Sequence, residues 1–338
     1  MKRSMVSGMV RPMIRSMVNS ESGIVSRYFS TLDPIQQGHY AMQNAKVMTD
    51  YEVSGLVYLD GTNDARLFGN LLNFSSRLFV SAAGSVDFRP AADSAISLLA
   101  PNGSVPLYKL SSVKVSRVGA TGYIYVNGAL VSSGAVPTGA SNINVINRNS
   151  TSYGGGVLAD VVITDLTTPS NSESWKIGNP PGTNTEQSSS GNNLLTYVNV
   201  TNRELFTEVN GDWLGVELVK QPINVALDWI PVAGAVISGA ETWGTPSTGG
   251  IRSGDIGAEG KRLRLSYSIF ADSSIITVKD SSAGQGGDPT VATVTANTTG
   301  EGVINYTATL GGLYIRSAGV SNENVMNSMS LKRILEVA

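Results

Sequence analysis

Few residues in this chain could carry catalytic chemistry, and their spacing forms no known catalytic arrangement. The 338-residue sequence has one histidine, His39, and no cysteine. An isolated histidine has no partner for acid–base or metal chemistry, so we interpret His39, which ends the turn-like segment 34–39, as a surface or capping residue. No Gly-x-Ser-x-Gly motif lies near it, and Gly154–Gly156 lacks the strand–helix context of a phosphate loop. The sequence therefore predicts no catalytic residues and no enzymatic activity.

One short segment has the residue types of a calcium site. Asp60, Asn63 and Asp64 carry oxygen atoms, the hard ligands that Ca²⁺ prefers. The alternative is a turn at Asp60-Gly61 followed by solvated polar residues, and the pattern favours this turn. Binding of Ca²⁺ by this segment remains an alternative to the plain turn, and no other cofactor is predicted.

Aromatic residues at loop edges are candidates for binding sugars, because the apolar face of a sugar stacks on an aromatic ring. Trp229, Trp243 and Tyr314 are the three candidates. Trp243 lies among polar residues and glycine in the segment 240–244, so we expect it to be the most exposed. The alternative for each residue is a place in the core, where large aromatic side chains are mostly found.

The composition predicts short strands joined by tight turns. Only 15% of the residues are charged and 37 are glycine, whereas about 25% charged residues is typical of soluble domains. A net charge of −2 gives no positive field for nucleic acid. No apolar run reaches the roughly 18 residues of a membrane span, so we expect no membrane insertion. The absence of cysteine excludes disulfides and favours a bacterial or viral source.

The first residues form a repeat of their own. Four copies of Met-(Val/Ile)-x-x begin at Met5, Met9, Met13 and Met17. Gly8 and Pro12 argue against a helix, and an extended segment of this kind cannot bury itself. Because methionine adapts to irregular grooves, we interpret residues 1–22 as an N-terminal arm that docks on a neighbouring subunit, against the alternative of a flexible tail. The predicted docking residues are Met5, Met9, Arg11, Met13, Arg15 and Met17.

Residues 23–220 predict one β-sandwich, because short apolar runs alternate with turn signals. The run Tyr123–Val131 is similar to a hairpin of laminin-G-like, concanavalin-A-type jelly rolls, in which Asn-Gly forms the two-residue turn. Val53–Tyr58 and Tyr153–Ile163 resemble the opening and closing strands of that fold. Within residues 167–219, Trp175 and Ile177 indicate a segment that packs on the sandwich. Leu194–Val200, followed by Asp212–Leu218, resembles a tail segment that follows such domains in phage virion proteins.

Residues 221–338 predict a second β-sandwich. In Arg262–Ile269 the positions Leu263, Leu265, Tyr267 and Ile269 alternate with polar residues, as in a half-buried strand. A further strand is expected at 224–229. The order of the strands resembles the carbohydrate-binding-module jelly rolls that end many phage tail proteins, and Met326–Ile334 is similar to their closing strand.

The predicted fold class is thus all-β, with two jelly-roll β-sandwich domains and an extended N-terminal arm. Glucanases of the first fold carry a Glu-x-Asp-x-x-Glu motif, which this chain lacks. The resemblances imply a phage virion protein of the tail, baseplate or head surface that binds glycans of the host envelope. It would be assembled in the bacterial host cytoplasm and held by its arm, and we expect a homotrimer. The alternative is a cement or decoration protein that stabilises capsid or tail subunits without binding glycans.

Overall fold

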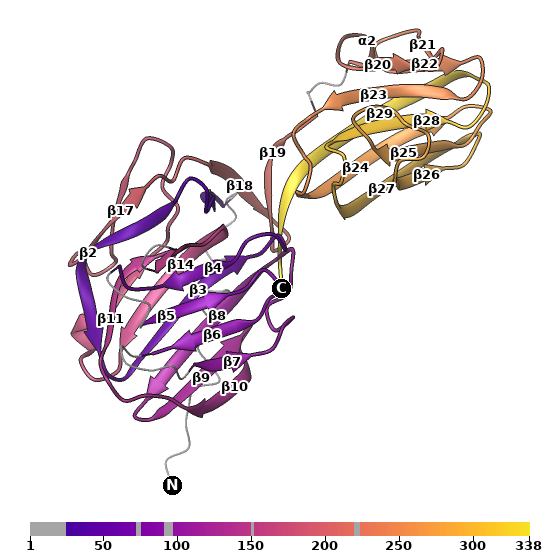
Figure 1. Ribbon diagram of the computed structural model, residues 1–338. Helices are drawn as coiled ribbons and strands as arrows, with labels where there is room; N and C mark the ends of the chain where they lie inside the picture. The colour runs from indigo at the N-terminus through magenta and orange to yellow at the C-terminus, as the bar shows by residue number, and fades with distance from the viewer. Residues whose placement is uncertain (1–24, 72–75, 91–96, 150–151, 220–223) are drawn as a thin grey trace. The chain divides into compact units, whose positions relative to one another are not determined.

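The structure is a computed structural model that describes residues 25–71, 76–90, 97–149, 152–219 and 224–338. Strands take up 59% of the described residues and helices 2%, which confirms the all-β fold class (Figure 1). In the described ranges, no helix is long and apolar enough to cross a membrane. The predicted docking residues lie outside these ranges: Met5, Met9, Arg11, Met13, Arg15 and Met17.

The chain forms two compact units. Of the described residues, unit 1 comprises those between 25 and 213 together with 335–338, and unit 2 comprises those between 214 and 334. The division falls within strand β19 (Asp212–Glu217) and again within β29 (Ser321–Val337). The sequence instead placed one boundary after residue 220, because it treated the strand around residues 212–218 as the end of the first domain.

Unit 1 is a β-sandwich. Its larger sheet has the strand order β10 (Ala129–Ala135), β9 (Thr121–Val126), β8 (Lys109–Val118), β3 (Tyr51–Tyr58), β14 (Gly156–Asp165), β1 (Ser26–Leu32) and β18 (Arg203–Val209), and β15 (Glu173–Trp175) also pairs with β14. A second sheet consists of β4 (Ala65–Phe68), β5 (Arg77–Val80), β6 (Val86–Arg89) and β7 (Leu98–Ala100). A third consists of β11 (Ser141–Ile146), β2 (His39–Met48), β17 (Leu194–Val198) and β16 (Thr185–Gln187). The remaining elements are the pair β12 (Arg148–Asn149) and β13 (Ser152–Tyr153) and the 3-10 helix η1 (Pro169–Asn171).

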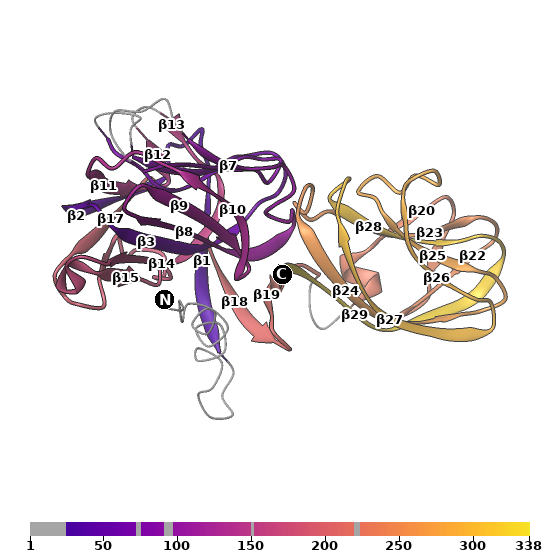
Figure 2. The same ribbon diagram turned by 90° about the horizontal axis from the view of Figure 1, so that it is seen from below.

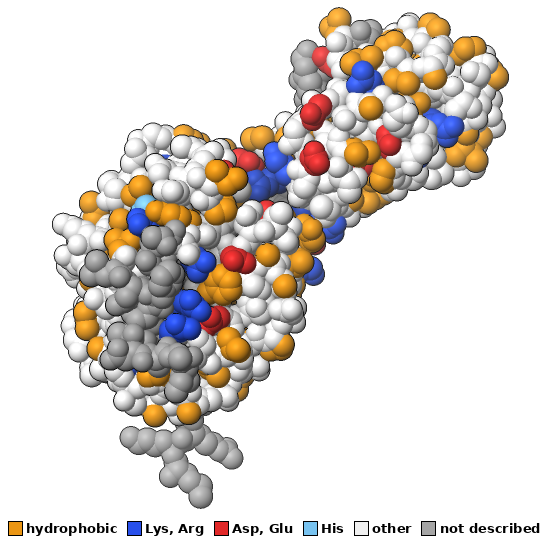
Figure 3. Space-filling model, viewed as in Figure 1, with side chains coloured by type: hydrophobic (Ala, Val, Ile, Leu, Met, Phe, Trp, Pro, Cys, Tyr) orange, Lys and Arg blue, Asp and Glu red, His pale blue; other side chains and the backbone are white. Residues whose placement is uncertain are grey.

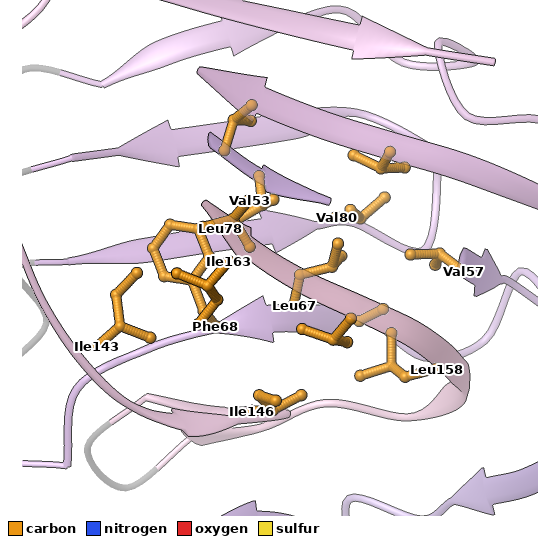
Figure 4. Packing of buried hydrophobic residues seen from close by; sticks show 14 of the residues in the cluster. Val53, Val57, Leu67, Phe68, Leu78, Val80, Ile143, Ile146, Leu158 and Ile163 are labelled. Carbon is orange, nitrogen blue, oxygen red and sulfur yellow. The ribbon is translucent and has the colours of Figure 1, made fainter. Parts of the chain in front are cut away.

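The core of unit 1 lies between these sheets, because alternate residues of each strand point inward. Figure 4 shows side chains of β3 and β14 packed against side chains of β4, β5 and β11. The labelled members are Val53, Val57, Leu67, Phe68, Leu78, Val80, Ile143, Ile146, Leu158 and Ile163. Burial of each such side chain stabilises the fold by roughly 1.5–3 kcal/mol.

The Asn-Gly hairpin predicted from the sequence is present. Asn127 has a φ of 51° and Gly128 a φ of 81°, the left-handed values that a two-residue hairpin turn requires. The Asn127 side-chain oxygen accepts a hydrogen bond of 2.9 Å from the backbone N–H of Ser112. The turn therefore fixes the register of β9 against β10, with Val126 opposite Ala129.

The segment after β14 packs on the sandwich, as its aromatic and aliphatic residues predicted. Trp175 and Ile177 are both buried in the core of unit 1. Glu173 of β15 also forms a buried ion pair with Lys46 of β2, with 3.0 Å between Oε1 and Nζ. This segment is therefore part of unit 1 and not a linker.

The last residues of the chain also belong to unit 1. Glu336 lies opposite Lys109 where the end of β29 pairs in parallel with β8. Leu335 is fully buried in a cluster that contains Phe29 and Phe206. Unit 1 is thus assembled from two stretches of sequence, with unit 2 inserted between them.

Unit 2 is a second sandwich of two sheets. One contains β27 (Thr298–Thr307), β24 (Arg262–Ala271), β29, β22 (Thr242–Thr245) and β21 (Val236–Ile237). The other contains β20 (Ile230–Val232), β23 (Gly249–Asp255), β28 (Gly312–Ser317), β25 (Ile276–Asp280) and β26 (Thr290–Val294). Figure 2 shows both units in a view turned by 90°.

Two sequence predictions for unit 2 have different outcomes. Leu263, Leu265 and Ile269 of β24 are fully buried, as the alternation indicated. The strand expected at 224–229 is wrong, because Val225–Asp228 forms the short helix α2. Asn224 caps it, with its side chain accepting a 3.2 Å hydrogen bond from the backbone N–H of Leu227, and this local bond competes with an extended conformation.

Candidate functional site

The aromatic residues chosen from the sequence as sugar-binding candidates are buried. Trp243 is 0% exposed and Trp229 is 4% exposed, and both belong to the core of unit 2. The expectation that Trp243 would be exposed is therefore wrong. The polar and glycine residues next to Trp243 in the sequence do not mark a loop, because this segment is strand β22. It pairs with β29, with Trp243 opposite Asn324. Its ring offers no free face to a sugar.

Tyr314 is buried for a different reason. It lies on β28 between Arg252 of β23 and Lys279 of β25, which are its partners in the strand register. Both flanking cations bond to the loop that follows β25: Arg252 donates to the carbonyl of Ser282, and Lys279 Nζ donates to the carbonyl of Asp288 at 2.7 Å. Tyr314 is only 2% exposed, and this burial raises the pKa of its phenol.

The predicted calcium segment forms the Asp-Gly turn that the sequence favoured. Asp60 Oδ1 accepts hydrogen bonds from the backbone N–H groups of Thr62 at 2.9 Å and Asn63 at 3.3 Å. Asp64 Oδ1 accepts one from the backbone N–H of Ala82 at 2.8 Å. Across the described ranges, no group of three or more His, Cys, Asp or Glu residues could hold a metal ion. Ca²⁺ binding stays a prediction.

His39 has a structural role in the interior. It is 5% exposed, so its expected place at the surface is wrong. Its ring lies against the ring of Tyr153, with 5.6 Å between the two centroids. Its Nδ1 lies 2.9 Å from the carbonyl of Gln37, and Arg148 Nη1 lies 3.4 Å from its Nε2. Burial, and secondarily the charge of Arg148, lowers the pKa of the imidazole.

The best candidate surface lies on β9, in the hairpin motif that we used only as a sign of the fold. Ile124 and Val126 point into the core, so Tyr123 and Tyr125 point to the opposite face of the sheet. Both tyrosines are half-buried. Their ring centroids are 6.4 Å apart and their ring planes are inclined by 28°, so the two rings form a stacked pair on the surface.

Charged residues on β8 and β3 hold one of these rings in place. Lys114 Nζ lies 4.6 Å from the centroid of the Tyr125 ring. The same Nζ lies 3.3 Å from Glu52 Oε1. Burial raises the pKa of Tyr125, and the nearby charge of Glu52 adds to the shift. Because the lysine and the glutamate neutralise each other, the surface around the rings has no net charge.

The edge strand β10 completes this surface, which we call the tyrosine face: Glu52, Lys114, Tyr123, Tyr125, Leu130 and Ser133. Leu130 lies opposite Tyr125 and is 54% exposed. Ser133 lies opposite Tyr123 and is exposed. Strand alternation in 121–126 is the signal that could have identified the two tyrosines, because it already placed Ile124 in the core.

Comparison with known proteins finds matches among solved structures. No protein-family model and no curated protein matches the chain. Among solved structures, the native heptameric SAP-like pentraxin from Limulus polyphemus has a TM-score of 0.33 and 13% identity, covering 41% of this chain and 76% of that one. The mouse laminin alpha1 chain, domains LG4-5, has a TM-score of 0.34 and 10% identity, covering 94% of this chain and 89% of that one.

Proposed function

We propose that this protein binds glycans through the tyrosine face of unit 1. The observation that carries the proposal is the pair of half-buried, stacked rings of Tyr123 and Tyr125 on the open face of a sheet. A sugar ring has an apolar face of C–H groups that packs on an aromatic ring. Two rings side by side on one strand offer such packing to neighbouring sugar units of a chain.

The surroundings of the rings favour an uncharged part of a glycan. Glu52 and Lys114 form an ion pair, so neither charge attracts an ionic ligand strongly. The hydroxyl of the exposed Ser133 and the phenol groups can exchange hydrogen bonds with sugar hydroxyls. Leu130 adds an exposed apolar side chain beside Tyr125. The ligand class is therefore a neutral stretch of a polysaccharide.

We further propose that the protein does this as part of a phage virion, on the host envelope. This part of the proposal is supported by the sequence resemblances to phage virion proteins and by the methionine repeat of residues 1–22. In the virion, the arm of residues 1–22 would fix the subunit to its neighbours. The protein would work as a homotrimer and would catalyse no reaction.

The test measures binding to an array of neutral and acidic oligosaccharides from bacterial surfaces. We expect Tyr123→Ala and Tyr125→Ala each to weaken binding to neutral glycans by roughly tenfold, which corresponds to about 1.4 kcal/mol. Val47→Ala, an exposed side chain on β2 of another sheet, is the matched control and should bind like wild type. Unchanged binding by the Tyr123→Ala, Tyr125→Ala double variant, with its fold intact, would contradict the proposal.

The alternative role as a cement protein is favoured by one feature of unit 2. Strand β27 runs for 10 residues and, within the described ranges, pairs only with β24. An edge strand presents backbone groups that can pair with another chain, and Val303 on β27 is 65% exposed. A protein that assembles normally but binds none of the arrayed glycans would support this role over glycan binding.

A further inference from the structure

The outer face of the second sheet of unit 1 gathers arginine residues. In β4, β5 and β6 the apolar residues point into the core, so the residues between them share the opposite face. We call this surface the arginine face: Arg66, Arg77, Phe79, Asp87, Arg89 and Leu99. Figure 3 shows basic, acidic and hydrophobic side chains close together on the visible side of unit 1.

Two arginines of this face oppose each other directly. Arg77 of β5 is the register partner of Arg89 of β6, and like charges directly opposite on neighbouring strands are destabilising. Arg77 forms an ion pair with Asp87. The Nε of Arg89 donates a 3.3 Å hydrogen bond to the Ser97 hydroxyl. The chain thus holds two guanidinium groups together and neutralises one of them.

A third guanidinium group lies over an aromatic ring. The Cζ atom of Arg66 is 4.8 Å from the centroid of Phe79. The Nε atoms of Arg66 and Arg77 are buried and have no hydrogen-bond partner among the described residues. Burial lowers the pKa of Arg66, against the nearby charges of Asp64 and Asp87. These cations are partly removed from water, so a bound anion would gain more from them than from exposed lysines.

The charges on and beside this face do not balance. The three arginines have two carboxylates near them, those of Asp64 and Asp87. One oxygen of Asp64 already accepts a hydrogen bond from the backbone N–H of Ala82. The remaining positive charge lies next to the Phe79 ring and to Leu99, which is 62% exposed. A ligand that suits this arrangement combines an anionic group with an apolar surface.

We infer that the arginine face is a second binding site, which takes an acidic polysaccharide. An anionic oxygen group, a carboxylate or a phosphate, would lie between Arg77 and Arg89, where a planar fork of donors can bind it. The attached sugar ring would pack on Phe79. This site goes beyond the proposed function, because it lies on a different sheet from Tyr123 and Tyr125 and recognises charge.

The experiment measures binding to three polymers at about 50 mM salt and again at about 200 mM. Polygalacturonate supplies carboxylates, wall teichoic acid supplies phosphates, and dextran is neutral. We expect wild-type protein to bind one or both of the acidic polymers, more weakly at the higher salt. Arg77→Gln, Arg89→Gln should reduce that binding at least tenfold, whereas Lys176→Gln, an exposed cation of unit 1, should not. Which polymer binds identifies the anionic group.

Other outcomes overturn the site. Absence of binding to both acidic polymers, or equal loss in Lys176→Gln, would show that the arginine face is not a specific site. If duplex DNA competes with the acidic polymer as well as the polymer itself does, the binding is a general attraction between charges and the site is not specific. If the double variant fails to fold, Arg89→Gln alone replaces it, because that guanidinium contacts only the Ser97 hydroxyl among the bonds described. The Tyr123→Ala, Tyr125→Ala variant should keep acidic-polymer binding, which separates failure of this site from failure of the tyrosine face.

Discussion

His39 is held as a neutral imidazole inside unit 1. Arg148 Nη1 can donate to Nε2 only while that nitrogen carries no proton. Burial lowers the pKa of His39 from the ordinary value of 6.5, so the unfolded chain binds a proton at a higher pH than the folded chain does. The contribution of His39 to stability is therefore full above about pH 6.5 and is lost as the pH falls through the folded pKa.

This argument predicts the behaviour of His39→Gln, which cannot take up the proton. Between about pH 7.5 and pH 5.5 the melting temperature of unit 1 should fall less in His39→Gln than in wild type. Thermal unfolding followed by circular dichroism at the two pH values measures the difference. Because the chain has one histidine, its NMR titration reports the folded pKa without overlap. Equal falls in both proteins would show that His39 is not the responsible group.

At the level of single residues, the sequence predicts a conformation correctly where an adjacent residue in the chain determines it. The left-handed conformation of Asn127 and Gly128 follows from the dipeptide itself. Trp243 shows the opposite case, because its polar neighbours pair with β29 and do not face water. The arginine face could not be predicted either. The positions of Arg77 and Arg89 opposite each other depend on the register between two strands, and the sequence does not specify that register.

At the level of elements, the ion pair between Lys46 and Glu173 fixes β15 against β2. Both side chains are nearly fully buried, at 8% and 1% exposure. Removing one partner leaves a buried charge without its counterion, so Lys46→Met should destabilise unit 1 by about 3–5 kcal/mol. Lys46→Met, Glu173→Leu removes both charges and should recover most of that loss.

Denaturant unfolding of Lys46→Met, of Glu173→Leu and of the double variant measures this effect as a double-mutant cycle. Lys114→Met is the matched control, because it removes a more exposed ion pair with Glu52 and should cost only about 1 kcal/mol or less. A Lys46→Met protein as stable as wild type would show that the segment around Glu173 is held by the burial of Trp175 and Ile177 alone.

Most strands were predictable, because apolar and polar residues alternate along them and the apolar residues mark the face that points into the core. Leu263, Leu265 and Ile269 show this in β24. The helix at 225–228 was not predicted, since a single turn has too few residues for periodicity to appear and depends on the cap supplied by Asn224.

At the level of the whole molecule, the insertion of unit 2 into unit 1 makes the last residues important for unit 1. Leu335 is fully buried beside Phe29 and Phe206. Leu335→Ala should therefore destabilise unit 1 by about 2–5 kcal/mol and leave unit 2 unchanged. Calorimetry that resolves one transition for each unit would measure this. A shift confined to the transition of unit 2 would contradict the assignment of residues 335–338.

The domain division illustrates what a linear scan of a sequence misses. From the sequence, every residue after 220 is predicted to lie in one domain, because nothing in residues 335–338 marks them as different from the strand that precedes them. Their place follows from the parallel pairing of Glu336 and Val337 with β8 and from the burial of Leu335 beside Phe29 and Phe206.

The same discontinuity sets an order for folding during synthesis. A ribosome releases the chain from its N-terminus, so residues 26–213 emerge first. Lys109 and Leu110, at the start of β8, gain their partners Glu336 and Val337 only after residues 335–338 are released. Unit 2 is contiguous in sequence and can fold as soon as its own strands are released. The unit that is translated first is therefore the one that is completed last.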